Sequence, residues 1–542
     1  MIAIIIFVVL IIGVLYPNAF TFIRSFFPDG GLSLAPYVRF FSTPSGREAL
    51  TNTLFISVVT VFLSAAIGVP LAFLFHRYEF RGRRVLRAIA SAPVLLPPLV
   101  GVLAIVFLYG ESGIVSRAIQ HAFGLAEPWP NLRGMTAILF VHAYTMYVYF
   151  FMFASAGLDR LDAAMEEAAE TLGASGFAKL TRVTLPMLVP SLVGASLVTF
   201  MSSMASFSAP YIFGGGIRVL SVEILNSKLN GNMPMALVET VLLATSSLSV
   251  LFVLRWYEGR HRYSSVGKGV ASRRTSITSN VSKALAGIIG GAVVLFLILP
   301  LLMVIVMSLV KDGTWTTELL PPSYTIENYI RLFRDPQFFE PIRNSLWMSG
   351  AATAANLVWG LLATFWLRRR KGNLRRFADV LIILPWALPG TVVALSAVES
   401  FSTVLAGTVV LLPFVYFIRN LPLVVRAIEA SFAQIDPSVE EAAATLGADS
   451  IYTIRRVVLP LVLPGAVAGS ILAFITALGE FVSSIVIYVY SNRPISIEIL
   501  SQLRQFNLGT ASAYGVLLIV LISVTLLAGE RLRGPGRDPL VQ

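Results

Sequence analysis

The chain contains the stretch EEAAETLGA at residues 166–174 and, much later, the stretch EEAAATLGA at residues 440–448. Eight of the nine positions are identical. Upstream, YVRFF at 37–41 matches YIRLF at 329–333. The chain is therefore a tandem duplication. The upstream match is more widely spaced than the nine-residue match, which places extra residues in the first copy, most simply in the polar stretch 110–133.

The composition indicates a membrane protein. Of 542 residues, 56% are hydrophobic and 13% are charged, whereas soluble domains carry about 25% charged residues. The mean hydropathy is +0.79. These values exclude a soluble globular protein, a disordered chain and collagen. Because the chain has no Cys, disulfides, thiolate metal sites and a Cys nucleophile are excluded as well.

A membrane-spanning helix needs about 20 mostly apolar residues. We predict twelve such spans, near residues 1–16, 53–75, 88–109, 135–157, 186–211, 236–254, 284–309, 344–367, 378–398, 402–418, 460–489 and 512–529. The opening residues lack the basic region of a signal peptide. We interpret them as the first span, an interpretation that leaves room for further residues upstream.

The basic residues orient the spans. The net charge is +12, and with the N-terminus inside, 28 of the 41 Lys and Arg residues fall in inside segments. Lys and Arg gather in cytoplasmic loops, so we predict a multi-pass membrane protein with both termini cytoplasmic. This distribution explains the basic character without a nucleic-acid partner.

The duplication defines the domains. We predict a first repeat at 1–262, a cytoplasmic linker at 263–282 and a second repeat at 283–542. Each repeat holds six spans, an even number, so both repeats share one orientation and are related by an axis along the membrane normal. The predicted fold is all-α, with about 12 transmembrane helices in two six-helix halves.

The two nine-residue blocks lie in inside loops and carry helix signals. Asp162 and Asp436 are predicted helix N-caps, the second followed by Pro437. Gly173 and Gly447 are predicted helix ends, where a left-handed backbone suits glycine. A helix that binds the membrane surface needs a large apolar face, and Glu-Glu-Ala-Ala lacks one. We therefore predict that these helices dock onto a cytoplasmic protein.

The pattern E-A-A-x-x-x-G, followed by a hydrophobic-Pro step into a span, resembles the EAA loop of ABC-importer permeases. In that family the loop forms coupling helices that sit in clefts on two ATPase subunits. By this resemblance, the ATPase-coupling residues are Glu167, Ala168, Ala169, Gly173, Glu441, Ala442, Ala443 and Gly447. The fused double layout, which covers essentially the whole chain, resembles the ferric-iron and thiamine permeases of bacterial type I importers.

The resemblance implies a complex in the lipid membrane. One copy of this chain would join two cytoplasmic ABC ATPases and one extracytoplasmic solute-binding protein, and ferric iron is the first choice of substrate. Thiamine and polyamines are alternatives. From other classes, an ion-gradient-driven secondary transporter would also show repeats and twelve spans, and a membrane scaffold without transport is a third possibility.

The sequence contains no motif for catalysis. It has no G-x-x-x-x-G-K-[ST] loop for ATP and no H-E-x-x-H motif. Its four His residues are scattered along the chain. We therefore expect no enzyme activity, no cofactor and no metal site in this chain, and we expect ATP hydrolysis in separate partner subunits.

Polar residues inside spans are candidates for a substrate path. Glu480 lies well inside the predicted span 460–489, so it should face a cavity, a partner or water, or be protonated. Glu239 and Glu399 lie nearer to span ends and are interpreted as interfacial, and His142 as a packing residue. The candidate path residues are Ser203, Ser206, Ser208, Glu480, Ser483 and Ser484.

Overall fold

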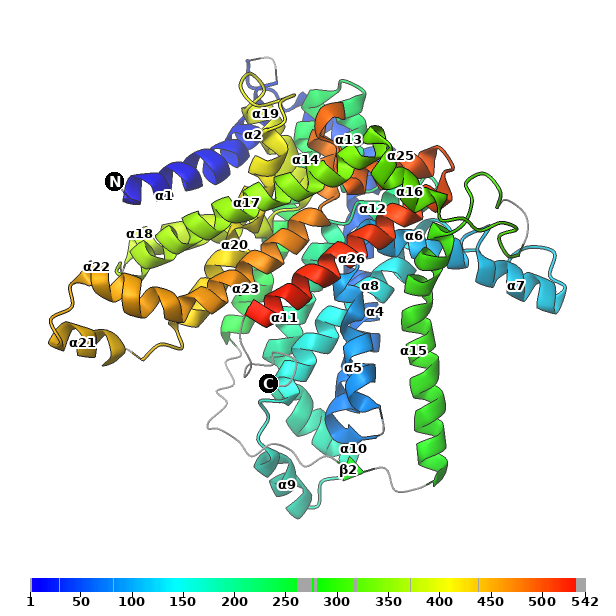
Figure 1. Ribbon diagram of the computed structural model, residues 1–542, viewed down its shortest axis with the longest axis horizontal. Coiled ribbons are helices and arrows are strands. Elements are labelled where there is room, and N and C mark those ends of the chain that lie inside the picture. The colour runs from blue at the N-terminus through cyan, green and yellow to red at the C-terminus, as the bar shows by residue number, and fades with distance from the viewer. Residues whose placement is uncertain are drawn as a thin grey trace. The chain divides into compact units, whose positions relative to one another are not determined.

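The computed structural model describes residues 2–28, 30–80, 82–260, 275–276, 280–315, 319–370, 372–436 and 438–532. Most of the predicted linker 263–282 and Pro437 lie outside these residues. The described chain is almost entirely helical, which confirms the all-α prediction (Figure 1). Two short strands, β1 (Tyr78–Glu79) and β2 (Thr275–Ser276), pair in parallel. The chain divides into two compact units.

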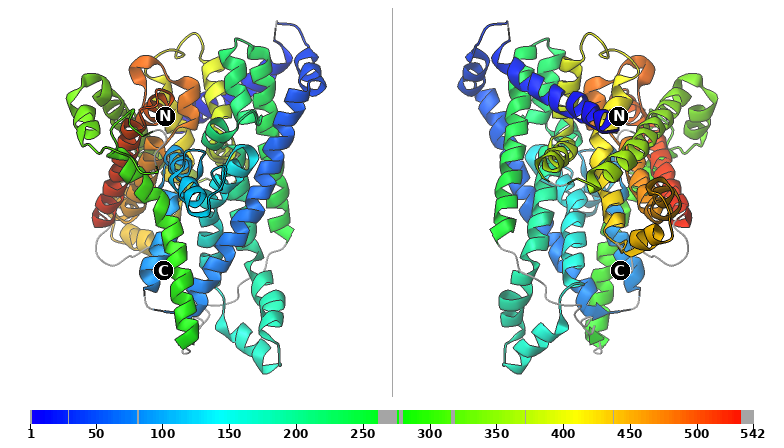
Figure 2. Two further views of the ribbon diagram at one scale, coloured as in Figure 1. Left: turned by 90° about the vertical axis from the view of Figure 1, so that its right-hand side faces the viewer. Right: turned by 90° about the vertical axis from the view of Figure 1, so that its left-hand side faces the viewer.

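The first-repeat unit comprises residues 35–310 and 314–324. Its framework is formed by α4, α8 and α11, which pack on one another. In Figure 2, α4 is the long blue helix of this unit. Its helices are α3 (Ala35–Ser42), α4 (Pro44–Arg77), α5 (Arg83–Ser91), η2 (Ala92–Leu95), α6 (Pro98–Tyr109), α7 (Ile114–Phe123), α8 (Gly134–Leu158), α9 (Ala163–Thr171), α10 (Gly176–Lys179), η3 (Leu180–Thr184), α11 (Leu185–Met204), α12 (Ser208–Phe213), α13 (Leu220–Leu229), α14 (Met233–Arg260) and α15 (Asn280–Ser308).

The second-repeat unit comprises residues 1–34, 311–313 and 325–542. Here α17, α20 and α23 pack together as the counterpart of the first framework (Figure 1). Its helices are α1 (Ile2–Leu10), η1 (Ile11–Leu15), α2 (Tyr16–Phe26), α16 (Glu327–Arg334), α17 (Pro336–Arg368), α18 (Asn373–Ala387), α19 (Gly390–Ser400), α20 (Leu411–Phe432), α21 (Ser438–Thr445), α22 (Ser450–Thr453), η4 (Ile454–Val458), α23 (Leu459–Leu478), α24 (Val482–Ile487), η5 (Tyr490–Asn492), α25 (Ile495–Arg504) and α26 (Leu508–Leu532).

The compact units do not coincide with the sequence repeats, because the first span of each repeat packs within the other unit. Ile6, Leu10 and Val14 are fully buried in a core that includes Ile418 of α20. Conversely, α15 packs in the first-repeat unit, where the Tyr144 hydroxyl donates a hydrogen bond to the carbonyl of residue 297 at 2.9 Å. The repeats have therefore exchanged their first helices.

The spans agree with the predicted number. Eleven helices in the described residues are long and apolar enough to cross a membrane, and a bent pair raises the number to twelve. The pair is α18 and α19, which meet at 109°. Pro389 precedes α19, and Pro97 precedes α6 in the other unit. Since proline lacks a backbone N–H, these residues interrupt both spans at the same place in each repeat.

The predicted span at 402–418 is wrong in position. Residues 401–410 form turns, and the helix α20 begins at Leu411 and runs to Phe432. Arg419 and Arg426, which the predicted topology places in a cytoplasmic loop, therefore lie within a helix. In the first repeat, the corresponding region carries the additional helix α7 within the predicted insertion 110–133.

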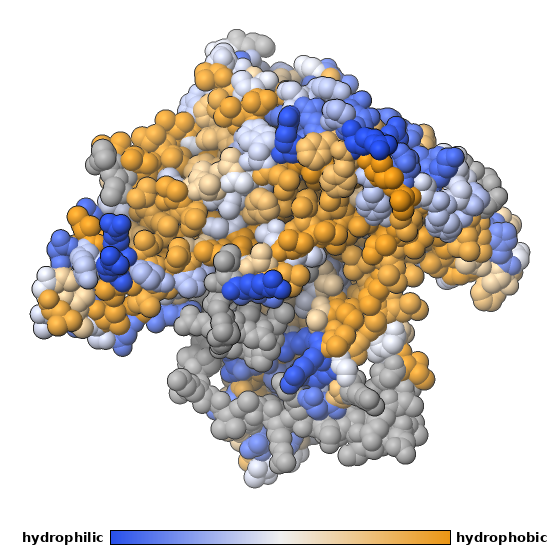
Figure 3. Space-filling model, in the orientation of Figure 1, coloured by the Kyte–Doolittle hydropathy of each residue, from blue (hydrophilic) through white to orange (hydrophobic). Residues whose placement is uncertain are grey.

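The outer faces of the helices are apolar. Figure 3 shows a broad hydrophobic surface over α17, α23 and α26. Exposed side chains on these helices include Val358, Leu472 and Val524, which are 48–60% exposed. Apolar surface of this extent on a soluble protein would be a liability, whereas a helix that crosses a bilayer presents such a face to lipid.

Candidate functional site

Helix α9 carries the first nine-residue block and is capped as predicted. The Asp162 carboxylate accepts a hydrogen bond from the backbone N–H of Ala164 at 3.0 Å, which satisfies a donor that the helix leaves free. Gly173 adopts φ +77° and ends the helix. Ser175 then caps the short helix α10 through the backbone N–H of Ala178 at 3.2 Å. Helix α9 forms a hairpin with α10, which begins the candidate span that continues through η3 and α11 (Figures 1 and 2).

Helix α21 repeats this construction in the second-repeat unit. The Asp436 carboxylate accepts from the backbone N–H of Ser438 at 2.9 Å, and this hydrogen bond lowers the pKa of Asp436. Gly447 adopts φ +81°. Asp449 caps α22 through the backbone N–H of Tyr452 at 2.6 Å. The predicted caps and helix ends are confirmed at both loops.

The first Glu of each block anchors its helix to a span. Glu166 accepts hydrogen bonds from Arg77 of α4 at 2.9 Å and from Thr184 at 2.7 Å. Burial raises the pKa of Glu166, but the Thr184 hydrogen bond and the Arg77 charge lower it further, so it lies below its usual value. In the other unit Glu440 pairs with Arg368 at the end of α17. Each surface helix is thus tethered to the second span of its own repeat.

Most of the ATPase-coupling residues expected from the resemblance are exposed to solvent. A second Glu (Glu167 or Glu441), an Ala (Ala168 or Ala442) and the glycine are exposed in each loop. The other Ala faces inward: Ala169 is half-buried and Ala443 is 9% exposed. The motif therefore combines an exposed polar face with a small residue that allows the helix to lie close to the span.

This surface also has an apolar part that the sequence pattern did not predict. Leu172 and Leu446 are 89% and 88% exposed, and Phe177 and Ile451 are both 76% exposed. The two members of each pair fall at corresponding positions when the nine-residue blocks are aligned, so the alignment of the repeats could have revealed them. Exposed apolar side chains of this size at matching positions are typical of a protein interface.

Loss of the tether should loosen α9. In the variant Arg77→Ala, Glu166 loses a partly buried ion pair worth about 1 kcal/mol, so amide exchange in residues 163–171 should accelerate roughly fivefold. Hydrogen–deuterium exchange measured by mass spectrometry tests this. The Glu166 pKa is lowered in the folded protein, so the tether is present above the free side chain's pKa and is lost as the pH falls through the folded value.

Arg160→Ala is the matched control for this experiment. Arg160 is exposed in the same loop, and no ion pair involves it in the part of the chain that the structure describes. Unchanged exchange of residues 163–171 in Arg77→Ala would contradict the tether. The same comparison applies to Arg368→Ala and residues 438–445.

Glu480 has an ionic partner. It lies in the break between α23 and α24, and its carboxylate is 3.5 Å from Nε of Arg419 on α20. The Glu480 and Arg419 side chains are 10% and 19% exposed. The carboxylate also accepts the backbone N–H of Ser483 at 2.8 Å. The sequence left open whether Glu480 faces a cavity, a partner or water, or is protonated, and the structure shows a charged partner, Arg419.

The pair is enclosed by small and hydroxyl residues. The Ser483 hydroxyl donates to the carbonyl of Gly390 at 3.2 Å, and the Ser484 hydroxyl lies 2.7 Å from the hydroxyl of Tyr416. A Cβ at Gly390 would lie 2.6 Å from Nη1 of Arg419, so a larger residue there would require the guanidinium to shift. The bend before α19, the break before α24 and helix α20 therefore meet at this ion pair.

The first-repeat unit has a neutral counterpart. His142 of α8 contacts the Ser206 hydroxyl at 2.8 Å through Nε2, and Thr60 and Ser203 at 3.1 and 3.2 Å through Nδ1. Ser206 corresponds to Glu480 when the nine-residue blocks are aligned. Ser208, also buried, begins α12 and takes no part in these contacts.

Five residues of these clusters were not predicted as site residues. Arg419 was placed in a loop, and His142 was interpreted as a packing residue. Gly390, Tyr416 and Thr60 were not singled out. The alignment of the nine-residue blocks pairs Arg419 with Thr145, inside the predicted span 135–157, so this alignment could have placed Arg419 in the membrane. Of the two Glu residues expected to be interfacial, Glu239 is 5% exposed, and Glu399 lies 3.8 Å from Arg24.

Each of the two repeats matches the same family of known proteins. Residues 66–263 and 356–533 match the family described as "Binding-protein-dependent transport system inner membrane component". The chain is also similar to the probable ABC transporter permease protein y4fN of Sinorhizobium fredii. The two are 29% identical over 510 residues, which cover 91% of this chain and 89% of that protein.

Two further relatives differ in the substrate that their names give. The ferric transport system permease protein FbpB of Actinobacillus pleuropneumoniae is 25% identical over 540 residues, which cover 98% of this chain and 77% of that protein. The molybdenum transport system permease protein ModB of Mycobacterium tuberculosis is 28% identical over 216 residues. That match covers 39% of this chain and 80% of that protein.

Proposed function

Because the chain belongs to the family of binding-protein-dependent transport system inner membrane components, we propose that it carries ferric iron across the bacterial cytoplasmic membrane. In this proposal two cytoplasmic ABC ATPases drive transport, and an extracytoplasmic binding protein delivers the iron. The chain itself is the ABC importer permease. Both of its termini are cytoplasmic, and the linker at 263–282 joins the two repeats on that side.

The duplicated surface of α9 and α21 carries the proposal. Each helix has one Glu tethered to a span, at Arg77 or Arg368, and an exposed leucine after it. A movement that a bound ATPase imposes on the helix would therefore be transmitted to α4 or α17. Two such surfaces with nearly the same residues fit two copies of an ATPase, and ATP-driven closure would move both helices together.

The intramembrane clusters supply the proposed path. Glu480, Ser483 and Ser484 line it in the second-repeat unit, and Ser203, Ser206 and Ser208 in the first-repeat unit. Broken helices with polar side chains at membrane depth are common at substrate sites of transporters, because irregular backbone there needs polar surroundings. Carboxylate and hydroxyl oxygens are hard ligands that suit Fe³⁺.

Ferric iron is favoured as substrate by the length of the FbpB match, which covers nearly the whole chain. The shorter ModB match supports an oxyanion such as molybdate as a second candidate. Proteoliposomes that contain the permease, its ATPases and its binding protein test both. ATP-dependent uptake of ⁵⁵Fe supports iron, whereas uptake of ⁹⁹Mo-molybdate without iron uptake would overturn it.

Truncation of the exposed leucine should weaken ATPase binding. Burial of a leucine side chain contributes about 1.5–3 kcal/mol, so Leu446→Ala should lower the affinity for the ATPase roughly tenfold. The double variant with Leu172→Ala should lower it further. Retention of the ATPase on the purified permease, measured over a range of concentrations, gives the change.

The control for the leucine variants is Phe123→Ala. Phe123 is 76% exposed on α7, far along the chain from both loops, and its truncation should leave ATPase retention unchanged. Equal retention in Leu446→Ala and in the unmodified chain would contradict the assignment of this surface.

A further inference from the structure

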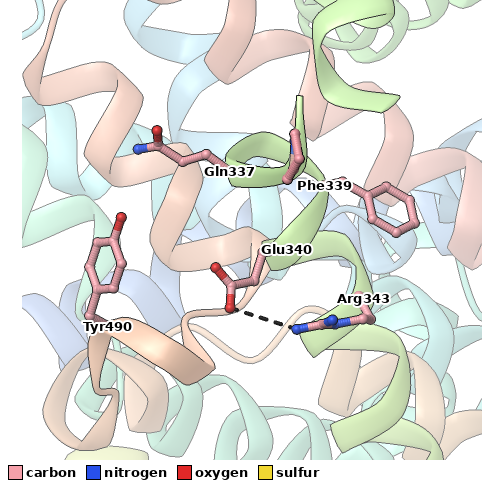
Figure 4. Close-up of a pocket in the computed structure, with 6 residues that line it drawn as sticks. Gln337, Phe339, Glu340, Arg343 and Tyr490 are labelled. Carbon is pink, nitrogen blue, oxygen red and sulfur yellow. Dashed lines mark ion pairs between the residues drawn. The ribbon is translucent and has the colours of Figure 1, made fainter. Parts of the chain in front are cut away.

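A pocket opens at the start of α17 in the second-repeat unit. Its volume is about 380 Å³, and it is lined by Pro336, Gln337, Phe339, Glu340, Arg343 and Tyr490. Figure 4 shows Gln337 and Glu340 of α17 extending toward the Tyr490 ring, which lies on the segment η5 across the opening. The pocket is thus formed where the N-terminal end of α17 meets the segment that precedes α25.

The pocket and the coupling helix lie at opposite ends of α17. This helix has 33 residues and rises 1.5 Å per residue, so it is about 50 Å long and can cross a bilayer with its headgroups. Its last residue, Arg368, pairs with Glu440 of the coupling helix α21. If α21 meets the ATPase in the cytoplasm, the pocket faces the outside.

Buried contacts hold the segment that carries Tyr490. Arg493 lies 4.6 Å below the centre of the Tyr490 ring, a cation–π contact. Its guanidinium lies 3.0 Å from the Glu498 carboxylate and donates to the Gln337 carbonyl at 3.3 Å. Asn344 of α17 donates to the carbonyl of Arg493 at 3.3 Å. The tyrosine is therefore presented on a rigid base, which reduces the entropy lost on binding.

The rim presents two side chains suited to protein recognition. Tyr490 is 67% exposed, and the Arg343 side chain is 65% exposed. Arg343 lies 3.7 Å from Glu340, which is longer than a hydrogen bond, so its guanidinium donors remain available. Tyr and Arg are enriched among residues that dominate binding energy at interfaces. An arginine fork also binds carboxylates in two-point fashion.

The first repeat has no counterparts of the rim residues Tyr490 and Arg343, although it does repeat the segment on which Tyr490 rests. The base recurs as RVLSVEIL at 218–225 and RPISIEIL at 493–500, and this alignment pairs Tyr490 with Gly215. The alignment of YVRFF with YIRLF pairs Arg343 with Thr51. The two repeats thus have nearly the same residues at the surface helices α9 and α21, whereas they differ at the opposite ends of α4 and α17. Two identical partners need two like surfaces, and a single partner with two different lobes needs two unlike ones.

We infer that this pocket docks one lobe of the extracytoplasmic binding protein, through a surface loop that places a carboxylate on Arg343 and packs against Tyr490. The inference rests on the proposed function and adds to it the side and the residues at which the binding protein attaches. The other repeat has Thr51 and Gly215 at the equivalent positions. Docking here would act on α25, whose Ser496 donates to the carbonyl of Glu480 at 2.9 Å.

The test uses the complete complex in lipid nanodiscs, with ATP hydrolysis measured against the concentration of cargo-loaded binding protein. In the variant Arg343→Glu, the half-saturating concentration of binding protein should rise by roughly tenfold or more, and in Arg343→Lys by less, because lysine keeps the charge but not the fork. The matched control is Thr51→Glu, which places the same charge at the equivalent position of the first repeat and should cause a smaller change.

The outcomes separate this inference from the proposed function. If the binding protein does not stimulate the unmodified complex, the proposed function fails and this inference with it. If it does, and Arg343→Glu responds at the same concentration while retaining its ATPases, the pocket is not the docking point. A third outcome would also overturn the inference. If free cargo bound directly to the permease, and Arg343→Glu abolished that binding but left docking of the binding protein unchanged, the pocket would be a cargo site.

Discussion

Replacing Arg419 by methionine should abolish ATP-driven uptake and lower the melting temperature of the protein. The substitution leaves the Glu480 carboxylate, whose side chain is 10% exposed, without its charged partner. Removal of one member of a buried ion pair costs about 3–5 kcal/mol, because the remaining charge is uncompensated. Thermal unfolding in detergent and uptake in proteoliposomes measure the two effects.

A double variant separates stability from transport. Arg419→Met combined with Glu480→Gln removes both charges, so the melting temperature should recover while uptake stays low. The control Arg426→Met lies on the same helix, and its partner Glu429 is one turn away on the exposed side. Such pairs contribute at most about 1 kcal/mol. If Arg419→Met unfolded at the same temperature as the unmodified chain, the ion pair would have no structural role.

Substituting valine for Gly173 and Gly447 together should reduce transport at least tenfold and release the ATPases. Both glycines have positive φ, +77° and +81°, a region that β-branched residues occupy only as outliers. No atom lies within 4 Å of a Cβ built at either position, so the cost comes from the backbone alone. Strain at the end of α9 and α21 should displace the leucines that precede these glycines in the docking surface.

Two controls identify the backbone as the cause. Gly173→Asn with Gly447→Asn should retain much of the activity, because asparagine tolerates the left-handed region. Gly176→Val lies in the same loop, equally free of neighbours but without a positive φ, and should have little effect. Equal loss in the asparagine and valine variants would show that side-chain size, and not φ, limits the turn.

The parts of this fold that depend on local pattern could be predicted. Hydrophobic length identifies spans, and the repeat at 166–174 and 440–448 identified the two capped surface helices. Family membership then decides for an ABC permease over a gradient-driven carrier or a scaffold. The exposed Leu172 and Leu446 were missed because an apolar residue in a loop has no local signature until the side that it faces is known.

The parts that depend on distant partners could not be predicted. The span at 402–418 was placed by apolar content alone, which excluded Arg419 because a charge disfavours membrane insertion. The helix tolerates this charge since Glu480, from the break between α23 and α24, lies beside it. In the same way, nothing in residues 2–26 indicates that they pack against α18 and α20. Their apolar side chains would suit almost any membrane neighbour.

The exchange of first helices bears on how the chain is made. Residues 2–26 leave the ribosome long before residues 336–432, whose helices bury Ile6 and Leu10. Until residues 336–432 are inserted, this helix lies in the bilayer and contacts lipid chains in place of its later protein neighbours. Covalent fusion of the two repeats keeps the waiting helix beside its future neighbours at high effective concentration. A gene split at the linker would give two products that each carry a helix belonging to the other.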